Sequence, residues 1–157
     1  MNEVKRIRVM LRSTFRGPAW HGPAVKKVLA GVEATTAAAH PIADTHSIWE
    51  MVLHMTYWRR VVVDALDGGT VDEHPPEELN WPAVTDDSPE AWQQAVAGLE
   101  ASQKELVARL ATLDDTRLNA NVRDRDYSLY FLVHGILQHD IYHAGQIALL
   151  KKSAGER

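Results

Sequence analysis

Four long stretches of the chain repeat apolar residues at the spacing of an α-helix. The first covers residues 3–16, where an apolar side alternates with a basic one, as in an amphipathic helix. The others cover residues 47–67, 88–113 and 129–152, and a shorter helix is predicted over residues 23–31. No stretch alternates apolar and polar residues as a half-buried strand does. The pattern therefore predicts an all-α fold, a four-helix bundle.

The ends of these stretches carry helix signals. Ser88 precedes Pro89, which indicates a capped helix start with proline in the first turn. Thr45 or Ser47 is in place to cap the preceding long helix, and Gly68 and Gly69 end it. These signals place the boundaries of the two middle helices.

Two connections are long for a compact bundle. Residues 35–47 read as a linker, and residues 70–88, which contain three prolines, read as an irregular segment. We expect at least one of them to be a crossover between opposite ends of the bundle, and a segment as long as 70–88 to be functional or mobile. Residues 114–128 are predicted to be a loop with at most one helical turn. Residues 1–157 are expected to form a single domain.

Composition narrows the functional classes. The 157 residues carry a net charge of -4, which offers no basic footprint for nucleic acid. The absence of cysteine excludes disulfides, thiolate nucleophiles and cysteine-ligated zinc sites, and is compatible with a reducing cytosol. The charged N-terminus lacks the apolar core of a secretory signal, and no run is long enough to span a membrane. A cytoplasmic protein is expected.

Polar residues interrupt the apolar line of the last helix. Steps of three and four residues give a seam that begins and ends apolar and holds two histidines and a glutamine at its centre: Leu129, Leu132, Ile136, His139, His143, Gln146 and Leu150. Polar groups on a buried line cost stability unless they have partners. Histidines four residues apart lie on one helix face, and that spacing allows both to ligate one metal ion.

A third histidine lies on the apolar line of another helix. Met51, His54, Trp58, Val61 and Ala65 also follow steps of three and four residues. If the two helices are neighbours, His54 joins His139 and His143, and three protein ligands leave positions open for water or substrate. A metal-free core in which the histidines are hydrogen-bonded remains the alternative.

Three segments resemble the DinB/YfiT-like family of proposed metalloenzymes: "HDIYHAGQIALLKK", "SIWEMVLHMTYWRRVV" and "GPAWHGP". The resemblance follows nearly the whole chain in order and spacing, and the His-x-x-x-His-x-Gly-Gln run is its most specific part. It implies a four-helix bundle in which His54, His139 and His143 hold a divalent metal ion, zinc or nickel. It also implies a homodimer.

The same resemblance implies an activity on a small molecule. A divalent ion lowers the pKa of a bound water or thiol and so generates a nucleophile. With water as the nucleophile the expected activity is that of a hydrolase, and with a thiol it is that of a low-molecular-weight-thiol S-transferase. Any thiol has to come from a cofactor or from the substrate, since the chain has no cysteine. A non-catalytic, metal-binding or dimeric stress-response protein is the alternative. No nucleic-acid or membrane partner is expected.

Four residues near the three histidines have other candidate roles. Glu50 lies one turn before His54, so it is a candidate for a fourth ligand, a general base or a hydrogen-bond partner of an imidazole. The simplest interpretation is that its carboxylate is favourably placed at a helix N-terminus and has no role in the site. Gln146 is interpreted as a partner of a ligand. Asp140 points about 100° away from His139 and is predicted to reach a neighbouring helix. Trp58 is predicted to be a pocket wall.

The remaining histidines are assigned to other roles. His134 lies off the ligand face and is predicted to be structural or exposed, and His21 lies in a turn. His40, His46 and His74 lie in connections and are predicted to be solvated. Gly145 is unfavourable in mid-helix by about 1 kcal/mol relative to alanine, which suggests close approach of another helix or a dimer contact.

Overall fold

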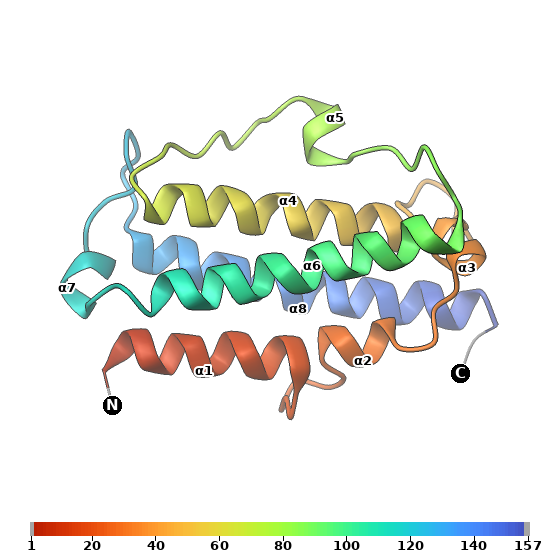
Figure 1. Ribbon diagram of the computed structural model, residues 1–157, viewed down its shortest axis with the longest axis horizontal. Helices are drawn as coiled ribbons and strands as arrows, with labels where there is room; N and C mark the ends of the chain where they lie inside the picture. The colour runs from red at the N-terminus through yellow and green to blue at the C-terminus, as the bar shows by residue number, and fades with distance from the viewer. Residues whose placement is uncertain (1, 156–157) are drawn as a thin grey trace.

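The computed structural model describes residues 2–155 and shows four long helices packed side by side (Figure 1). They are α1 (Glu3–Arg16), α4 (Ile48–Leu66), α6 (Pro89–Leu110) and α8 (Leu129–Ser153). Within residues 2–155 there is no strand, only two isolated β-bridges. The predicted all-α four-helix bundle is confirmed.

The segment between α4 and α6 is the crossover. In Figure 1 it leaves one end of α4, passes along the outside of that helix and returns to the other end of the bundle, so that α4 and α6 run in the same direction. One helical turn, α5 (Glu77–Asn80), interrupts it after Pro76. The long connection predicted at residues 70–88 is therefore a crossover, and it carries residues past the middle of α4.

Three further short helices fill the other connections: α2 (Val25–Leu29), α3 (Ala34–Ala38) and α7 (Asp115–Leu118). The prediction that residues 35–47 are only a linker is wrong at its start, because α3 occupies it. Ala34 and Ala37 of α3 are buried against α4, so tertiary packing stabilises a helix with no side-chain cap. The predicted helical turn within residues 114–128 is present as α7.

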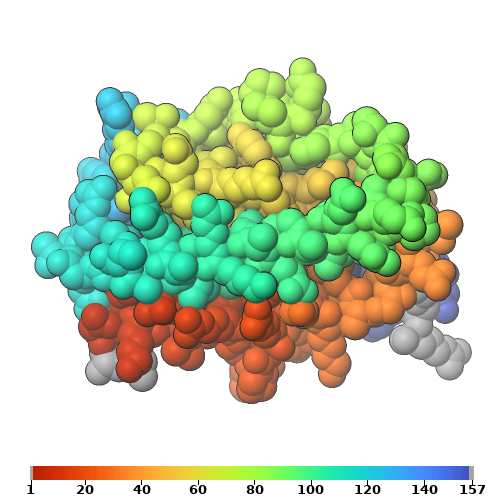
Figure 2. All heavy atoms as spheres, in the orientation of Figure 1, coloured from red at the N-terminus to blue at the C-terminus, as the bar shows by residue number. Residues whose placement is uncertain are grey.

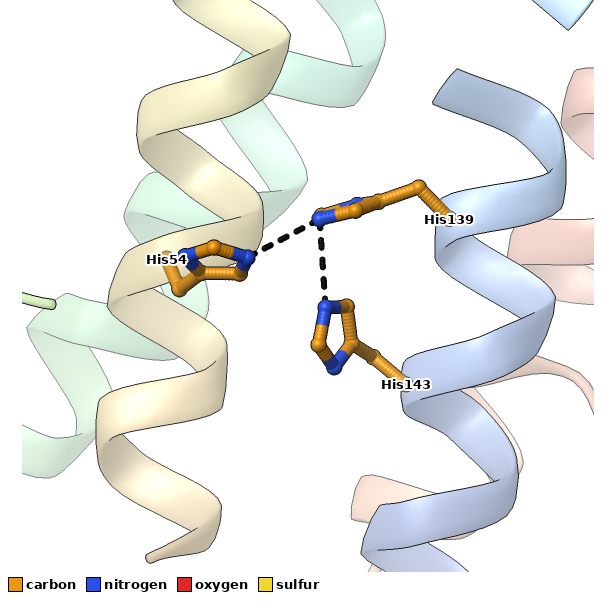
Figure 3. A group of neighbouring side chains, drawn as sticks. All are labelled: His54, His139 and His143. Carbon is orange, nitrogen blue, oxygen red and sulfur yellow. Dashed lines mark hydrogen bonds between the residues drawn. The ribbon is translucent and has the colours of Figure 1, made fainter. Parts of the chain in front are cut away.

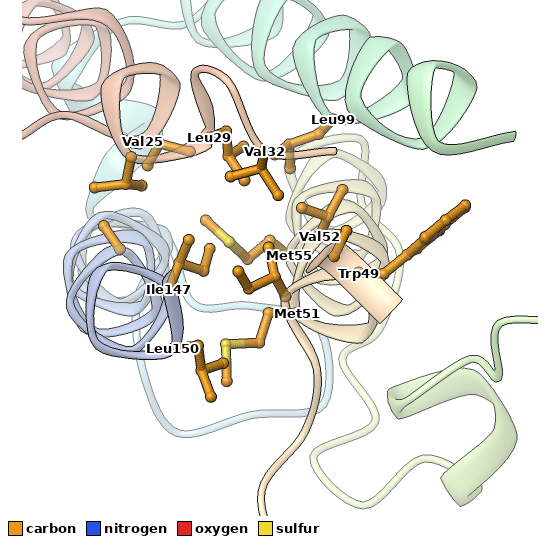
Figure 4. Packing of buried hydrophobic residues seen from close by; sticks show 14 of the residues in the cluster. Val25, Leu29, Val32, Trp49, Met51, Val52, Met55, Leu99, Ile147 and Leu150 are labelled. Atoms are coloured by element: carbon orange, nitrogen blue, oxygen red, sulfur yellow. The ribbon is translucent and has the colours of Figure 1, made fainter. Parts of the chain in front are cut away.

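Two groups of buried apolar residues form the core. One, toward the end of the bundle that holds α2 and α3, packs Met51 and Met55 of α4 against Ile147 and Leu150 of α8, with Leu99 of α6 beside them (Figure 4). The other fills the opposite end between α1, α4, α6 and α8. At about 25 cal/mol per Å² of buried apolar surface, this burial is the main stabilising contribution to the fold.

The buried stripe of α8 is rotated from the predicted seam. Leu132, His139 and Gln146 are only partly buried, whereas Asp140 and Ile147 are inaccessible. A helix surrounded by several neighbours buries a face wider than a single line, so the seam predicted from spacing is one edge of that face. His139 therefore lies at the edge of the buried face, whereas His143 lies within it.

None of the helices in the described part of the chain is both long enough and apolar enough to cross a membrane. The single domain and the cytoplasmic location stay predictions.

Ser47 rather than Thr45 caps α4. Its hydroxyl accepts a hydrogen bond from the Glu50 backbone N–H at 3.1 Å, while the Glu50 carboxylate accepts one from the Ser47 N–H at 2.7 Å. We expect Ser47→Ala to lower the free energy of unfolding by about 1 kcal/mol, because one amide of the first turn loses its partner in a buried position. Urea denaturation would measure this. Ser47→Asp, which keeps an acceptor, should retain most of the stability, and equal losses in both variants would contradict the capping role.

Candidate metal centre

Three histidine side chains from two helices point toward one another between α4 and α8 (Figure 3). His54 comes from the middle of α4, and His139 and His143 come from successive turns of α8. α4 and α8 pack directly against each other, which brings together residues 85 positions apart in the chain. The convergence predicted from the two apolar lines is thus present in the structure.

The three imidazoles approach through their Nε2 atoms. His139 Nε2 lies 2.9 Å from His54 Nε2 and 3.1 Å from His143 Nε2. Metal–nitrogen bonds of about 2.0–2.1 Å place two ligand nitrogens of one ion about 3 Å apart, so this spacing suits a shared ion. Within the described residues, no further histidine, aspartate or glutamate joins this cluster.

Carbonyl oxygens fix the orientation of two of the rings. His54 Nδ1 lies 2.7 Å from the backbone oxygen of Asn80, and His143 Nδ1 lies 2.6 Å from Oε1 of Gln146. A carbonyl oxygen only accepts, so each Nδ1 carries the proton and donates it. In the neutral ring the Nε2 atom then holds a lone pair, and this is how outer hydrogen bonds orient histidine ligands toward a metal.

The contacts between the three Nε2 atoms have too few hydrogens to be ordinary hydrogen bonds. His54 and His143 both offer lone pairs at Nε2, and His139 Nε2 carries at most one hydrogen, which satisfies only one of its two contacts. His139 Nδ1 is also buried without a hydrogen-bond partner. Lone pairs about 3 Å apart repel unless a cation lies between them. The three residues therefore fit a divalent cation better than a metal-free, hydrogen-bonded core.

Burial keeps the cluster neutral. It is the largest cause that lowers the pKa of His139 to about 2, followed by the positive charges that His143, His54 and Arg59 would present. Burial likewise lowers the pKa of His143 to about 4 and lowers the pKa of His54. Because metal ions bind the neutral imidazole, the protein holds His139 and His143 in their ligating form well below neutral pH, and burial favours the same form of His54.

The crossover covers His54. The indole of Trp81 stacks on the His54 ring with centroids 3.8 Å apart and planes 5° apart, and it stacks in the same way on His46 at 3.5 Å. Trp58 lies edge-on to His54 and donates its indole N–H to the Asn80 side chain at 3.0 Å. The crossover therefore both orients and shields a candidate ligand. Trp58 lines the site as predicted, whereas the prediction that His46 is simply solvated is wrong.

A buried ion pair lies directly behind the cluster. Asp140 follows His139 in the chain and faces α4, where its Oδ2 lies 2.8 Å from Nη2 of Arg59, and both side chains are inaccessible to solvent. Burial raises the pKa of Asp140 to about 6, and Arg59 opposes this rise. The prediction that Asp140 reaches a neighbouring helix is confirmed. The pair ties α4 to α8 at the level of the histidines.

Glu50 is not part of the cluster. Its carboxylate accepts from the Ser47 backbone and lies 3.1 Å from His40 Nε2 and 3.6 Å from His46 Nδ1. Burial is the largest single contribution and raises the pKa of Glu50. The hydrogen bond to Ser47 and the neighbouring His40 and His46 lower this pKa and outweigh burial, so the pKa of Glu50 is lowered overall. The interpretation of Glu50 as a carboxylate at a helix N-terminus is confirmed, and its interpretation as a ligand is wrong.

The other predicted residues lie away from the cluster. His134 lies against Tyr130 of its own helix, with Nδ1 3.0 Å from the Tyr130 backbone oxygen, and His21 and His74 are exposed. Gly145 is exposed, and a Cβ atom at this position would have open space around it, with no atom of another helix within 4 Å. Close approach of another helix of this chain is therefore not the reason for that glycine.

Sequence reasoning missed three residues that matter at the site: Arg59, Asn80 and Trp81. Arg59 follows Trp58 in an apolar run, and an arginine in such a run is a signal for a buried ion pair. Asn80 and Trp81 lie among the prolines of the crossover, where a tryptophan is unusual for a solvated loop. Which helix this segment covers depends on the path of the chain, and no local pattern specifies it.

Fold and cluster together define the class of the protein as a four-helix bundle with a three-histidine site that fits a divalent metal ion. The sequence matches the DinB superfamily over residues 20–147, and the chain belongs to this family. No curated protein and no solved structure matches it.

Proposed function

We propose that this protein is a metal-dependent enzyme in which His54, His139 and His143 hold a divalent ion, zinc or nickel. The observation that carries the proposal is the convergence of three neutral imidazoles whose Nε2 atoms face one another. Three imidazole ligands suit zinc and nickel among other transition metals. Such an ion supplies Lewis acidity that lowers the pKa of a water or a thiol and stabilises the anion formed.

The residues of the chain have separate roles in this proposal. The Asn80 carbonyl and the Gln146 amide oxygen keep the Nδ1 protons of His54 and His143 in place, so that both rings present Nε2. Trp81 shields His54 from water, and its position in the crossover makes that segment the element that selects the substrate. With three protein ligands, positions remain for a small molecule. We propose hydrolysis, or transfer of a low-molecular-weight thiol, as the reaction.

Elemental analysis of tag-free protein tests the metal site. We expect about one equivalent of a divalent metal in the wild-type protein, and a loss of most of it in the His139→Ala/His143→Ala variant, because two of three ligands are gone. His134→Ala, which removes a histidine from the same helix outside the cluster, should keep the metal. Absence of metal from the wild-type protein after incubation with zinc and with nickel would contradict the proposal.

Turnover is then measured on the metal-loaded protein. Hydrolysis of small ester and amide substrates, and consumption of a low-molecular-weight thiol by an electrophile, are compared with the metal-free protein and with the double histidine variant. Activity that requires both the ion and the histidines supports the enzyme. One equivalent of bound metal without turnover would favour a non-catalytic metal-binding protein.

We further propose that the protein forms a homodimer through the outer face of α8. Phe131, Tyr142 and Leu149 are 64%, 64% and 57% exposed, and their spacing places them within about 20° of one another around the helix. Gly135 and Gly145 flank this stripe with open space above them, so a second helix can come close. An exposed apolar stripe of this kind is typical of an interface, and a second copy presents the same stripe.

Light scattering coupled to size-exclusion chromatography tests the dimer. The wild-type protein should have the mass of two chains, and Tyr142→Glu/Leu149→Glu should have the mass of one, since charges in an apolar interface are desolvated without partners. Val9→Glu, at an exposed apolar position on α1, should leave the dimer intact. A monomeric wild-type protein, or a double variant that stays dimeric, would contradict this face as the interface.

A further inference from the structure

A second concave site lies between α1 and α6, on the face seen in Figure 2, where these two helices lie against each other. It is a groove of about 570 Å³. Its lining comes from α1 and α6 and from the residue that follows each of them, whereas the histidine cluster lies between α4 and α8. A molecule in this groove would therefore not touch the three histidines.

Positive charge concentrates along this groove. Arg8, Arg12 and Arg16 follow one another at four-residue intervals on α1, and Lys104 lines the groove from α6. The side chains of Arg12, Arg16 and Lys104 are exposed. The net charge of the chain is -4, so this local excess of cations is not apparent from composition. In the sequence it is visible only as the basic side of an amphipathic helix.

Carboxylates of the chain neutralise little of this charge. In the described part of the chain, neither Arg8 nor Arg12 forms an ion pair with a carboxylate. Glu100 is near enough to Arg16 and Lys104 for both to help lower its pKa, but the main cause is its hydrogen bond to Lys26, whose Nζ lies 2.7 Å from Oε1. The groove thus keeps uncompensated cations toward its α1 side.

One donor in the groove has no acceptor. The Nε atom of Arg8 is buried and has no hydrogen-bond partner. Within the described residues no acceptor offsets the charge at this atom, and the exposed guanidinium of Arg12, one turn along α1, is accessible to an anionic oxygen of a ligand. The buried side chains at the base of the groove are mainly apolar: Phe15 is 1% exposed and Val107 is 7% exposed. Cations beside an apolar floor suit a molecule with an acidic group and an apolar body.

We propose that this groove binds a soluble amphipathic anion, a carboxylate or phosphate monoester whose acidic group lies against Arg8 and Arg12 and whose apolar part lies on Phe15 and Val107. Arginine provides paired donors that match the oxygens of either group. The volume suits a small molecule, since ligand pockets are typically about 300–1,000 Å³. This proposal does not depend on the metal site, and either can fail without the other.

Buried polar contacts lead from the inner wall of the groove toward α8. Gln103 lines the groove, and its Oε1 accepts a hydrogen bond from Arg59 Nε at 3.1 Å. Arg59 in turn pairs with Asp140, the residue after His139. This buried network therefore runs from the groove to the residue that follows His139 in the chain.

Isothermal titration calorimetry with octyl phosphate and with octanoate, below the concentrations at which they form micelles, tests the proposal on the full-length protein. We expect saturable binding of about one equivalent, and binding at least tenfold weaker in Arg12→Gln and in Arg8→Gln. Arg12 is exposed, so its replacement leaves folding intact even if that of Arg8 does not. Arg6→Gln removes the same charge from an exposed position of α1 outside the groove and should bind like wild type.

Two further probes distinguish an anion site from a purely apolar one and a soluble ligand from a membrane surface. Octan-1-ol has the same chain without the charge, and it should bind at least tenfold more weakly than octanoate. Phosphatidylglycerol vesicles test the same chemistry presented by a membrane. Binding to vesicles without binding to either soluble anion would overturn the proposal, as would no saturable binding, or equal weakening by Arg6→Gln and Arg12→Gln.

Discussion

Replacing Asp140 with alanine is expected to lower the free energy of unfolding by about 3–5 kcal/mol, because the change leaves a buried guanidinium without its counter-charge. Arg59 and Asp140 are both inaccessible to solvent, and Nη2 and Oδ2 are 2.8 Å apart. For a domain of this size, the loss corresponds to a melting temperature lower by roughly 10 °C. Thermal and urea denaturation would measure it.

The surroundings of Arg59 account for the size of the loss. Its Nε donates to Gln103 and its Nη1 donates to the Met55 backbone oxygen at 3.3 Å, while the guanidinium lies 5.2 Å from the centre of the Phe15 ring. These contacts hold the cation in place but carry no negative charge. Without Asp140, the buried charge has only neutral partners, and water cannot reach it unless the helices separate.

Two variants provide the comparison. Arg109 and Asp67 form an ion pair on the surface, with side chains 44% and 40% exposed, so Asp67→Ala should cost less than about 1 kcal/mol. Arg59→Met/Asp140→Leu replaces both buried charges with apolar groups and should recover much of the stability lost in Asp140→Ala. A loss in Asp140→Ala no larger than that in Asp67→Ala would contradict the buried pair as a stabilising contact.

Mild acid is expected to destabilise the metal-free protein through the histidine cluster. Burial lowers the pKa of His139 to about 2 and that of His143 to about 4, and it also lowers the pKa of His54. In the unfolded chain each imidazole has a pKa of about 6.5. Below that pH the unfolded state binds protons that the folded state does not bind, so stability falls as the pH falls.

The size of this effect follows from the number of groups. His139 and His143 each lower the free energy of unfolding by roughly 1 kcal/mol per pH unit below about pH 6. Asp140 works in the opposite direction, because burial raises its pKa to about 6 and the folded state then takes up a proton first. His139 and His143 together outweigh Asp140 and leave a net loss of about 1 kcal/mol between pH 6 and pH 5, and His54 adds to this loss in the same direction.

Urea denaturation of the metal-free protein at pH 7, 6 and 5 measures this dependence. His139→Leu/His143→Leu removes two of the three groups and should make the stability nearly independent of pH over this range. His134→Leu, a change on the same helix outside the cluster, should keep the wild-type dependence. A wild-type dependence that survives in the double variant would show that the acid sensitivity arises elsewhere.

Both predictions concern residues that share the contact between α4 and α8. The Arg59–Asp140 pair fixes the two helices at the level where His54 meets His139, so a variant of the pair is expected to affect the histidine geometry as well as the stability. Metal content of Asp140→Ala would therefore be informative beside its melting temperature. The stability of the fold and the shape of the site depend on the same few contacts.

Local sequence patterns were enough to predict the helices and the candidate ligands. Periodicity, the Ser88 cap and the Gly68–Gly69 stop placed the four long helices, because these signals act within a few residues of the chain. His139 and His143 follow from spacing on one helix, and His54 follows from its place on a second apolar line. The resemblance of short motifs to a family added the expectation that the three meet.

The surroundings of those ligands depend on tertiary packing. The path of the crossover brings Asn80 and Trp81 onto His54, and only the packing of α4 on α8 pairs Arg59 with Asp140. The cationic groove also forms only when α6 lies beside the basic side of α1. Local sequence patterns reflect hydrogen bonds and packing between residues that are close in the chain. The contacts named here join residues tens of positions apart, so their geometry depends on how whole helices pack.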